Sequence, residues 1–111
     1  QSTSIPVGER RLVETGIAMA IPPGFVGLIW DRSGLAAKNG LTMLGGVIDS
    51  NYRGEIKIIV HNLGTEPFQV ESGMRIAQML IQPVTQKEIQ EVQELDETIR
   101  QNDGFGSSGL K

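Results

Sequence analysis

The sequence predicts an all-β domain, either a barrel or a sandwich of short strands. Its 111 residues include 14 glycines and 5 prolines spread along the chain, with β-branched runs between them. This texture is typical of many short strands joined by tight turns. A chain of this length forms one domain and buries roughly two-thirds of the surface that its unfolded form exposes. It can therefore form a core without disulfides.

Composition and charge exclude several classes of protein. The chain has no cysteine, so it holds neither a disulfide nor a thiolate metal site and suits a reducing compartment. We expect a cytoplasmic location, or a nuclear or virion-associated one for a eukaryotic or viral source. The formal net charge of -3 argues against nucleic acid or an anionic membrane as a partner. No apolar run approaches the roughly 20 residues that span a bilayer.

The first part of the chain is predicted to form an edge or a loose end, followed by two strands. Residues 1–6 are polar and turn-rich, which is typical of a free terminus, and residues 12–13 read as a short strand. In residues 17–21 the large side chains occupy alternate positions, which predicts a strand with one buried face. Pro22-Pro23-Gly24 then ends that strand.

A longer strand and a short helix are predicted next. The near-continuous apolar run at 25–30 is long enough for a strand buried on both faces. Trp30, the only tryptophan, is interpreted as a core or interface anchor rather than as a ligand-stacking residue. Residues 35–38 favour one or two helical turns, which Gly40 closes as the C-cap.

The stretch 45–54 is predicted to be the centre of a hairpin. Val47-Ile48 and the run 56–60 are strand-like, and turn-forming residues separate them. Such a hairpin presents Asp49 and Tyr52 at its tip. Taken alone, Asp49 is more typical of an Asx-turn than of a catalyst.

The following strands are predicted from alternation and turn residues. They cover residues 55–62, 68–70 and 75–81. His61 is the only histidine and is interpreted as a polar strand residue, since one histidine cannot build a histidine-based metal site. Gln78 is a polar residue within an apolar strand, so it is either a structural hydrogen bonder or a ligand contact.

The C-terminal part divides into a charged stretch and a glycine-serine tail. In residues 87–100, Ile89, Val92 and Leu95 recur at intervals of three, which by periodicity favours an amphipathic helix. The tail that follows is rich in glycine and serine, which is typical of a flexible segment.

Two stretches are candidates for binding phosphate. Arg32-Ser33-Gly34 offers a guanidinium, a hydroxyl and open backbone N–H groups in one turn. The tail at 104–109, with Arg100 before it, offers two more hydroxyls, although it has no Walker motif. Together with Asp49 and Tyr52, these stretches describe a pocket with an acid, an aromatic ring, phosphate donors and an aromatic lid.

The sequence resembles the homotrimeric dUTPases, which hydrolyse deoxyuridine triphosphate. Four of that family's five motifs occur here in order and cover nearly the whole chain. They are Asp31-Arg32-Ser33-Gly34-Leu35-Ala36, Gly46-Val47-Ile48-Asp49-Ser50-Asn51-Tyr52-Arg53-Gly54, Gly73-Met74-Arg75-Ile76-Ala77-Gln78-Met79-Leu80, and Arg100 with Gly104-Phe105-Gly106-Ser107-Ser108-Gly109.

The resemblance implies a jelly-roll-like β-barrel that forms a homotrimer, with each active site assembled from three chains. It implies that residues 1–99 form the barrel and residues 100–111 a flexible lid arm. It also implies that residues 87–100 are an extended arm that crosses to another subunit, and we adopt this in place of the helix.

The resemblance further implies hydrolysis of dUTP to dUMP and pyrophosphate, which limits uracil in DNA and supplies dUMP. Asp49 would hold and deprotonate the attacking water, and Tyr52 would pack under the deoxyribose and exclude a ribose. Mg²⁺ would bind through the substrate phosphates, with no direct protein ligand. The remaining implied contacts are Gly46, Val47 and Ile48 to the uracil edge, Arg32, Ser33, Gly34 and Gln78 to the triphosphate, Phe105 and Gly106 in the lid over the uracil, and Arg100, Ser107 and Ser108 to the γ-phosphate.

Two departures keep other functions open. The family's first motif, Ala-Gly-Xaa-Asp-Leu, has no match, and since the chain starts at Gln1 rather than Met, we expect that a segment before it is missing. Gln101 stands where the family usually has glycine. The alternatives are a non-catalytic nucleotide-binding or regulatory relative, and a dCTP deaminase on the same fold, although deaminases of that group need a glutamate where this hairpin offers Asp49.

Overall fold

A computed structural model describes residues 2–85 and 88–96. Within these residues the chain forms eight short strands and one short helix, which confirms the predicted all-β class. Their bounds are β1 (Thr3–Ile5), β2 (Arg10–Glu14), β3 (Phe25–Asp31), α1 (Ser33–Asn39), β4 (Leu41–Leu44), β5 (Val47–Ile48), β6 (Lys57–Asn62), β7 (Phe68–Val70) and β8 (Ala77–Pro83). No helix of the described ranges is long and apolar enough to cross a membrane.

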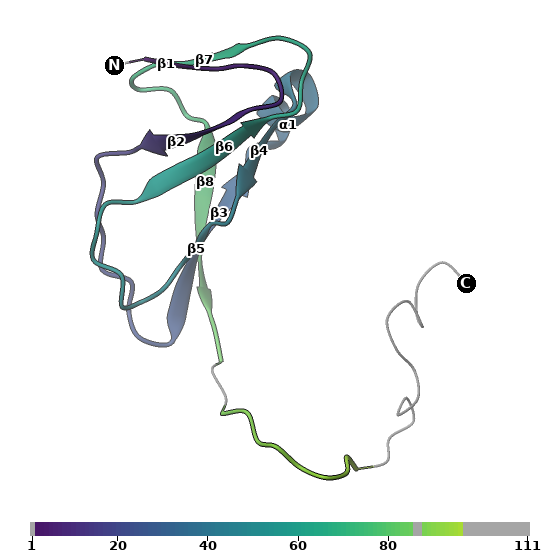
Figure 1. The fold of residues 1–111 in the computed structure, drawn as a ribbon. Helices are drawn as coiled ribbons and strands as arrows, with labels where there is room; N and C mark the ends of the chain where they lie inside the picture. Colours follow the sequence, from purple (N-terminus) through teal and green to yellow (C-terminus); the bar gives the residue numbers. More distant parts are fainter. Residues whose placement is uncertain (1, 86–87, 97–111) are drawn as a thin grey trace.

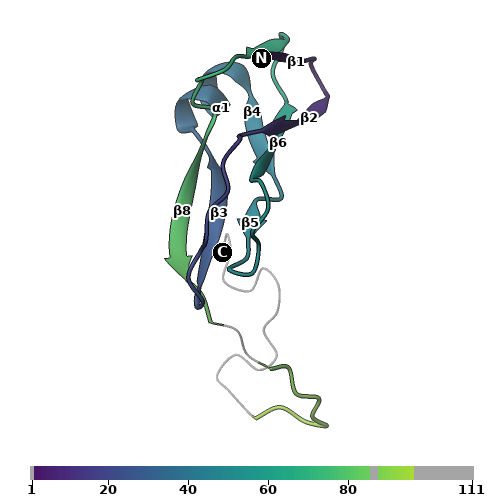
Figure 2. The same cartoon turned by 90° about the vertical axis from the view of Figure 1, so that its left-hand side faces the viewer.

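The strands form two three-stranded sheets and one two-stranded ribbon. The sheet orders are β2-β6-β4 and β5-β3-β8, and β1 pairs with β7. The two larger sheets lie as two layers, and the β1-β7 ribbon and α1 lie at the same end of them (Figures 1 and 2). The core is a cluster of buried aliphatic side chains, namely Ile5, Leu41, Val60, Val70 and Ile76.

Of the two alternatives predicted for the N-terminus, the structure shows an edge strand and not a loose end. Residues 3–5 pair with β7 in antiparallel register, and Ile5 is completely buried. The buried side chain of Asn62 holds this end in place by donating a hydrogen bond of 2.9 Å to the Ile5 carbonyl oxygen. The partner strand lies more than 60 residues along the chain, so local composition carries no signal of the pairing.

The predicted hairpin between residues 47–48 and 56–60 is also wrong. β5 pairs with β3, through Gly27 opposite Ile48, whereas β6 pairs with β2 and β4 in the other sheet. The residues between β5 and β6 therefore cross from one layer to the other. Alternation of side chains marks both strands correctly but says nothing about which strand each one joins.

The predicted strand at 17–21 does not form. Residues 15–22 are irregular, and of the alternating side chains Ile21 is buried while Ile17 and Met19 are exposed. The Ile17 carbonyl oxygen accepts a hydrogen bond from the Ile56 N–H at 2.8 Å. Residues 15–22 therefore contact the residues before β6 through this backbone bond, but they do not pair with another strand.

β3 forms as predicted but is buried on one face only. Gly27 faces the core, since an added Cβ would lie 2.8 Å from Ile21 Cδ1. On the opposite face Trp30 is 55 % exposed. Trp30 is therefore not a core residue, and its role as an interface anchor stays a prediction. The register places these side chains on the exposed face: Leu28 and Trp30 of β3, Gln78 and Leu80 of β8, and Val47 of β5.

The predicted helical turns and their C-cap are confirmed. α1 ends at Gly40, which has a left-handed φ of 72° and donates its N–H to the Ala36 carbonyl oxygen at 3.0 Å. A Cβ at this position would lie 2.6 Å from the Gly64 nitrogen. Only glycine satisfies both the backbone conformation and this close approach.

The C-terminal stretch is not helical at residues 88–96. Ile89 is 95 % exposed, and this segment lies away from the sheets (Figure 1). The helix favoured by periodicity is wrong here, because a stripe of isolated apolar side chains with no surface to pack against gives no stable helix. Residues 87 and 97–111, and with them the predicted boundary at 99–100, lie outside the described residues.

Candidate active site

A cationic cavity lies where β3 runs into α1. It has a volume of about 580 Å³. Among the described residues, three cationic side chains and no carboxylate line it. Such a set suits a ligand with several phosphate groups. The lining residues are Arg32, Ser33, Gly34, Leu35, Lys38, Asn39, Arg75 and Gln78.

The local sequence explains how the predicted phosphate residues reach this cavity. Arg32 caps α1 with an extended backbone (φ −92°, ψ 125°), and its carbonyl oxygen accepts the Ala36 N–H at 3.0 Å. The first turn of a helix leaves its own N–H groups without intrahelical partners. Ser33 and Gly34 lie in this turn and line the cavity together with Arg32, and their role in binding phosphate stays a prediction.

Lys38 and Arg75 line the same cavity but were not predicted as site residues. Lys38 lies four residues after Gly34, so helical spacing places it on the same side of α1. Arg75 lies two residues before Ala77, which pairs with Asp31. Extending that register brings Arg75 opposite Ser33. The helical spacing of Lys38 could have been recognised in the sequence. The position of Arg75 could not, because it depends on the pairing of β3 with β8.

Gln78 has a structural role and also lines the cavity. It lies opposite Trp30 in the sheet, and its Nε2 donates a hydrogen bond of 2.7 Å to the main-chain carbonyl oxygen of Asp31. The sequence left a structural bond and a ligand contact as alternatives. The bond is observed, and the ligand contact stays a prediction.

Asp49 lies in a turn that does not depend on its carboxylate. The Tyr52 N–H donates to the main-chain carbonyl oxygen of Asp49 at 3.1 Å, and the Asp49 side chain is exposed. The turn is thus closed through the backbone rather than as an Asx-turn. The carboxylate stays accessible to a ligand or a water molecule.

Tyr52 is held by its own loop. Its hydroxyl donates a 2.5 Å hydrogen bond to the Glu55 carbonyl oxygen. A Cβ at Gly54 would lie 2.7 Å from the Tyr52 hydroxyl oxygen and 2.9 Å from the ring carbon Cζ. The aromatic ring therefore occupies the space that a side chain at position 54 would need.

The same loop is tied to the residues that precede β3. The Glu55 carboxylate accepts the Gly16 N–H at 2.8 Å, and the Thr15 hydroxyl donates to the Ile56 carbonyl oxygen at 2.6 Å. These bonds fix the end of the loop that carries Tyr52. Sequence reasoning missed this tie, because the partners lie about 40 residues apart.

The three predicted uracil-edge residues lie along β3. The Gly46 carbonyl oxygen accepts the Ile29 N–H at 2.8 Å, and a Cβ at Gly46 would lie 2.9 Å from the Ile29 carbonyl oxygen. Gly46 is thus in close backbone contact with β3. Val47 is 64 % exposed and Ile48 is half-buried.

One chain keeps the Asp49 turn and the cationic cavity apart. Ile48 lies opposite Gly27, and the chain runs on from Ile48 toward the start of β3. Arg32 lies five residues beyond Gly27 in the other direction, which is roughly 17 Å at the rise of a strand. Asp49 and Arg32 of the same chain therefore do not line one pocket.

The remaining predicted site residues belong to the C-terminal tail. Arg100, Phe105, Gly106, Ser107 and Ser108 lie outside the described residues. Within residues 2–85 and 88–96, no three His, Cys, Asp or Glu side chains gather in a way that could hold a metal ion.

Comparisons with known proteins identify the family. The dUTPase family model matches residues 1–109. The deoxyuridine 5'-triphosphate nucleotidohydrolase of Rhizobium etli (strain CIAT 652) is 51% identical over 109 residues, which are 96% of this chain and 70% of that protein.

Solved structures agree with the sequence comparison. A mutant dUTPase of Staphylococcus bacteriophage 80alpha with dUpNHpp superposes with a TM-score of 0.90 at 28% identity, covering 99% of this chain and 82% of that one. A mutant dUTPase from phage phi11 of S. aureus, described with a structural Mg(II) ion, gives a TM-score of 0.79 at 25% identity over 85% of this chain and 78% of that one. Family model, sequence identity and fold agree, and the chain belongs to the dUTPase family.

Proposed function

We propose that this chain is a dUTP nucleotidohydrolase that converts dUTP to dUMP and pyrophosphate, and so limits uracil incorporation into DNA. The observation that carries the proposal is the cavity of Arg32, Lys38 and Arg75, in which the described lining residues include no carboxylate. A triphosphate carries the charge that such a cavity neutralises. The exposed Asp49 supplies the base that hydrolysis needs.

In this mechanism Asp49 accepts a hydrogen bond from a water molecule and takes its proton as the water attacks the α-phosphorus. The new P–O bond forms in line with the bond to the leaving pyrophosphate, which departs toward the cavity. Arg32, Arg75 and Ser33 hold the phosphates there and stabilise the charge that develops on the leaving group. Mg²⁺ bound to the phosphate oxygens would neutralise further charge at the same place.

Each active site is completed by a second copy of the chain within a homotrimer. The main support for this assembly is the distance along β3 from Gly27, which lies opposite Ile48, to Arg32. This distance is roughly 17 Å at the rise of a strand, so one chain cannot bring Asp49 to the cavity. The exposed face of the β5-β3-β8 sheet offers an apolar surface for subunit contact. There Trp30 is 55 % and Leu80 45 % exposed.

The other residues implied by the resemblance complete the site. The main chain of Gly46, Val47 and Ile48 reads the uracil edge, and Gly34 and Gln78 add contacts to the triphosphate. Phe105 and Gly106 close over the uracil, while Arg100, Ser107 and Ser108 contact the γ-phosphate. This lid excludes bulk water from the reacting phosphate.

The decisive test of the activity is pyrophosphate release from dUTP with and without Mg²⁺, with UTP, dTTP and dCTP as controls. We expect Mg²⁺-dependent release from dUTP alone. Tight binding of dUTP without release would contradict an enzyme, and ammonia release from dCTP would indicate a deaminase.

Gly54→Ala is expected to lower the discrimination between dUTP and UTP by about tenfold in kcat/KM, because one displaced contact in a specificity pocket is worth at least that much. The added Cβ would displace the Tyr52 ring, which packs under the sugar and leaves no room for a 2′-hydroxyl. The measurement is kcat/KM for both nucleotides.

Two variants of Tyr52 serve as controls. Tyr52→Ala should lose discrimination as Gly54→Ala does, whereas Tyr52→Phe removes only the bond to the Glu55 carbonyl oxygen and should keep most of it. Unchanged selectivity in Tyr52→Ala would refute the sugar gate. Unchanged selectivity in Gly54→Ala alone would refute the role of Gly54.

A further inference from the structure

Asp31 lies at the end of β3, directly before the cationic cavity, but its side chain is not part of the lining. The carboxylate accepts two hydrogen bonds from β4. Oδ2 accepts the Thr42 hydroxyl at 2.7 Å, and Oδ1 accepts the Met43 N–H at 2.7 Å. Both bonds are partly buried, so the carboxylate is held by two fixed neutral donors.

These bonds join the two layers of the fold at the cavity. β3 is the central strand of one sheet, and β4 is an edge strand of the other. The chain between Asp31 and Thr42 contains α1 together with Arg32, Ser33 and Lys38 of the cavity. The carboxylate thus closes the base of the loop that carries most of the phosphate-binding side chains.

The main chain of Asp31 fixes the opposite wall. Its carbonyl oxygen accepts the Gln78 Nε2–H at 2.7 Å, and Gln78 lines the cavity from β8. Asp31 therefore fixes the relative positions of β3, α1 and β8, which carry the side chains of the cavity. A binding site loses affinity and rate when such a frame loosens, even by about 1 Å.

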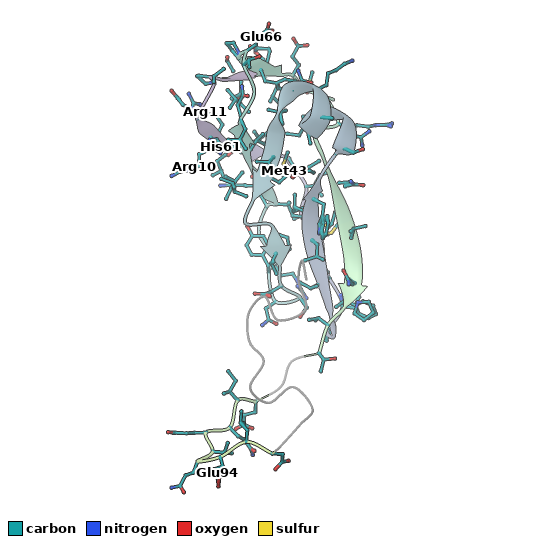
Figure 3. All side chains as sticks on the ribbon, turned by 90° about the vertical axis from the view of Figure 1, so that its right-hand side faces the viewer. Arg10, Arg11, Met43, His61, Glu66 and Glu94 are labelled. Carbon is teal, nitrogen blue, oxygen red and sulfur yellow. The ribbon has the colours of Figure 1, made fainter. Side chains whose placement is uncertain are left out.

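The carboxylate also leaves the cavity cations free for a ligand. In the described part of the chain the one ion pair joins Arg11 to Glu9 (Figure 3 labels Arg11). The Asp31 oxygens accept from Thr42 and Met43 instead, and within the described residues this acid forms no ion pair with Arg32 or Arg75.

We propose that Asp31 is a positioning residue for the triphosphate half of the active site. It contacts no substrate and acts through Arg32, Ser33 and Gln78. This inference rests on the proposed hydrolysis of dUTP. It predicts that loss of the carboxylate weakens binding of the β- and γ-phosphates while binding of the uracil and sugar is retained.

The test compares the affinities of the 111-residue chain for dUpNHpp and for dUMP, measured by calorimetry. Asp31→Ala should bind dUpNHpp about tenfold more weakly, as expected when bonds to a charged group are lost, and dUMP within about twofold of the unmodified chain. Asp31→Asn should restore most of the affinity, because its amide oxygen can accept the Met43 N–H while its NH₂ donates to the Thr42 hydroxyl.

Thr42→Val tests the same contact if Asp31→Ala fails to fold. It removes only one donor and should weaken dUpNHpp binding by a smaller factor of about threefold, again without an effect on dUMP. Thr65→Val, which changes an exposed threonine outside the cavity lining, is the matched control and should change neither affinity.

Equal weakening of both ligands in Asp31→Ala and Thr42→Val, or no weakening in either, would overturn the positioning role. So would failure of Asp31→Asn to bind better than Asp31→Ala. Failure of the proposed function looks different, since the unmodified chain would then release no pyrophosphate from dUTP.

Discussion

Asp49→Asn is expected to bind dUpNHpp normally and to lose almost all turnover. An amide cannot take the proton of the attacking water, and a positioned general base contributes about 10²- to 10⁴-fold to the rate. Binding should survive, because the turn is closed by the Asp49 main-chain carbonyl oxygen and asparagine is an equally good turn residue. Pyrophosphate release gives kcat, and calorimetry with dUpNHpp gives the affinity.

The matched control for this variant is Glu66→Gln. Glu66 is an exposed acid in the turn before β7, and Figure 3 places it at the end of the molecule that carries the β1-β7 ribbon. Glu66→Gln changes the net charge by the same amount as Asp49→Asn and should leave kcat unaltered. A near-normal kcat in Asp49→Asn would remove Asp49 from the role of base.

Local signals in the sequence were sufficient for most elements. α1 and its end at Gly40 were predicted because a left-handed glycine C-cap is a property of a few consecutive residues. β7 and β8 followed from alternation between turn residues. These features depend on neighbours in the chain, so a single sequence contains the information that specifies them.

Pairing between distant segments was not predictable in the same way. β1 is only three residues long and gains its stability from β7 and the buried Asn62. β5 was assigned to the wrong partner, because its two apolar residues fit β3 as well as they fit β6. Register depends on packing across the whole fold, which no local pattern reports.

The site shows the same division. Arg32, Ser33, Gln78 and Asp49 were selected by residue type and motif, and the first three do line one cavity. Arg75 and the ties made by Asp31 depend on the pairing of β3 with β8 and on its contact with β4. The distance between Asp49 and the cavity likewise follows from the register of β5 on β3. It predicts that the two parts of one active site come from different subunits.

A one-to-one mixture of Asp49→Asn and Arg32→Ala chains is expected to recover activity that neither variant has alone. If each site takes Asp49 from one chain and the cavity from its neighbour, random assembly in a closed ring makes about one site in four fully intact. Both variants would be co-expressed, and pyrophosphate release per site would be compared with that of the unmodified chain. About a quarter of the normal rate is expected.

A mixture of the unmodified chain with the double variant Asp49→Asn, Arg32→Ala distinguishes a shared site from a site within one chain. A shared site again needs two unmodified neighbours, so about a quarter of the sites are active, whereas a site within one chain would leave about half active. Under the one-chain arrangement the two single variants would not rescue each other at all. Rescue near one quarter in both mixtures would thus follow only from a pocket that joins the Asp49 turn of one subunit to the cavity of the next. The register of β5 on β3 supports this arrangement, because it holds the two halves apart within each chain.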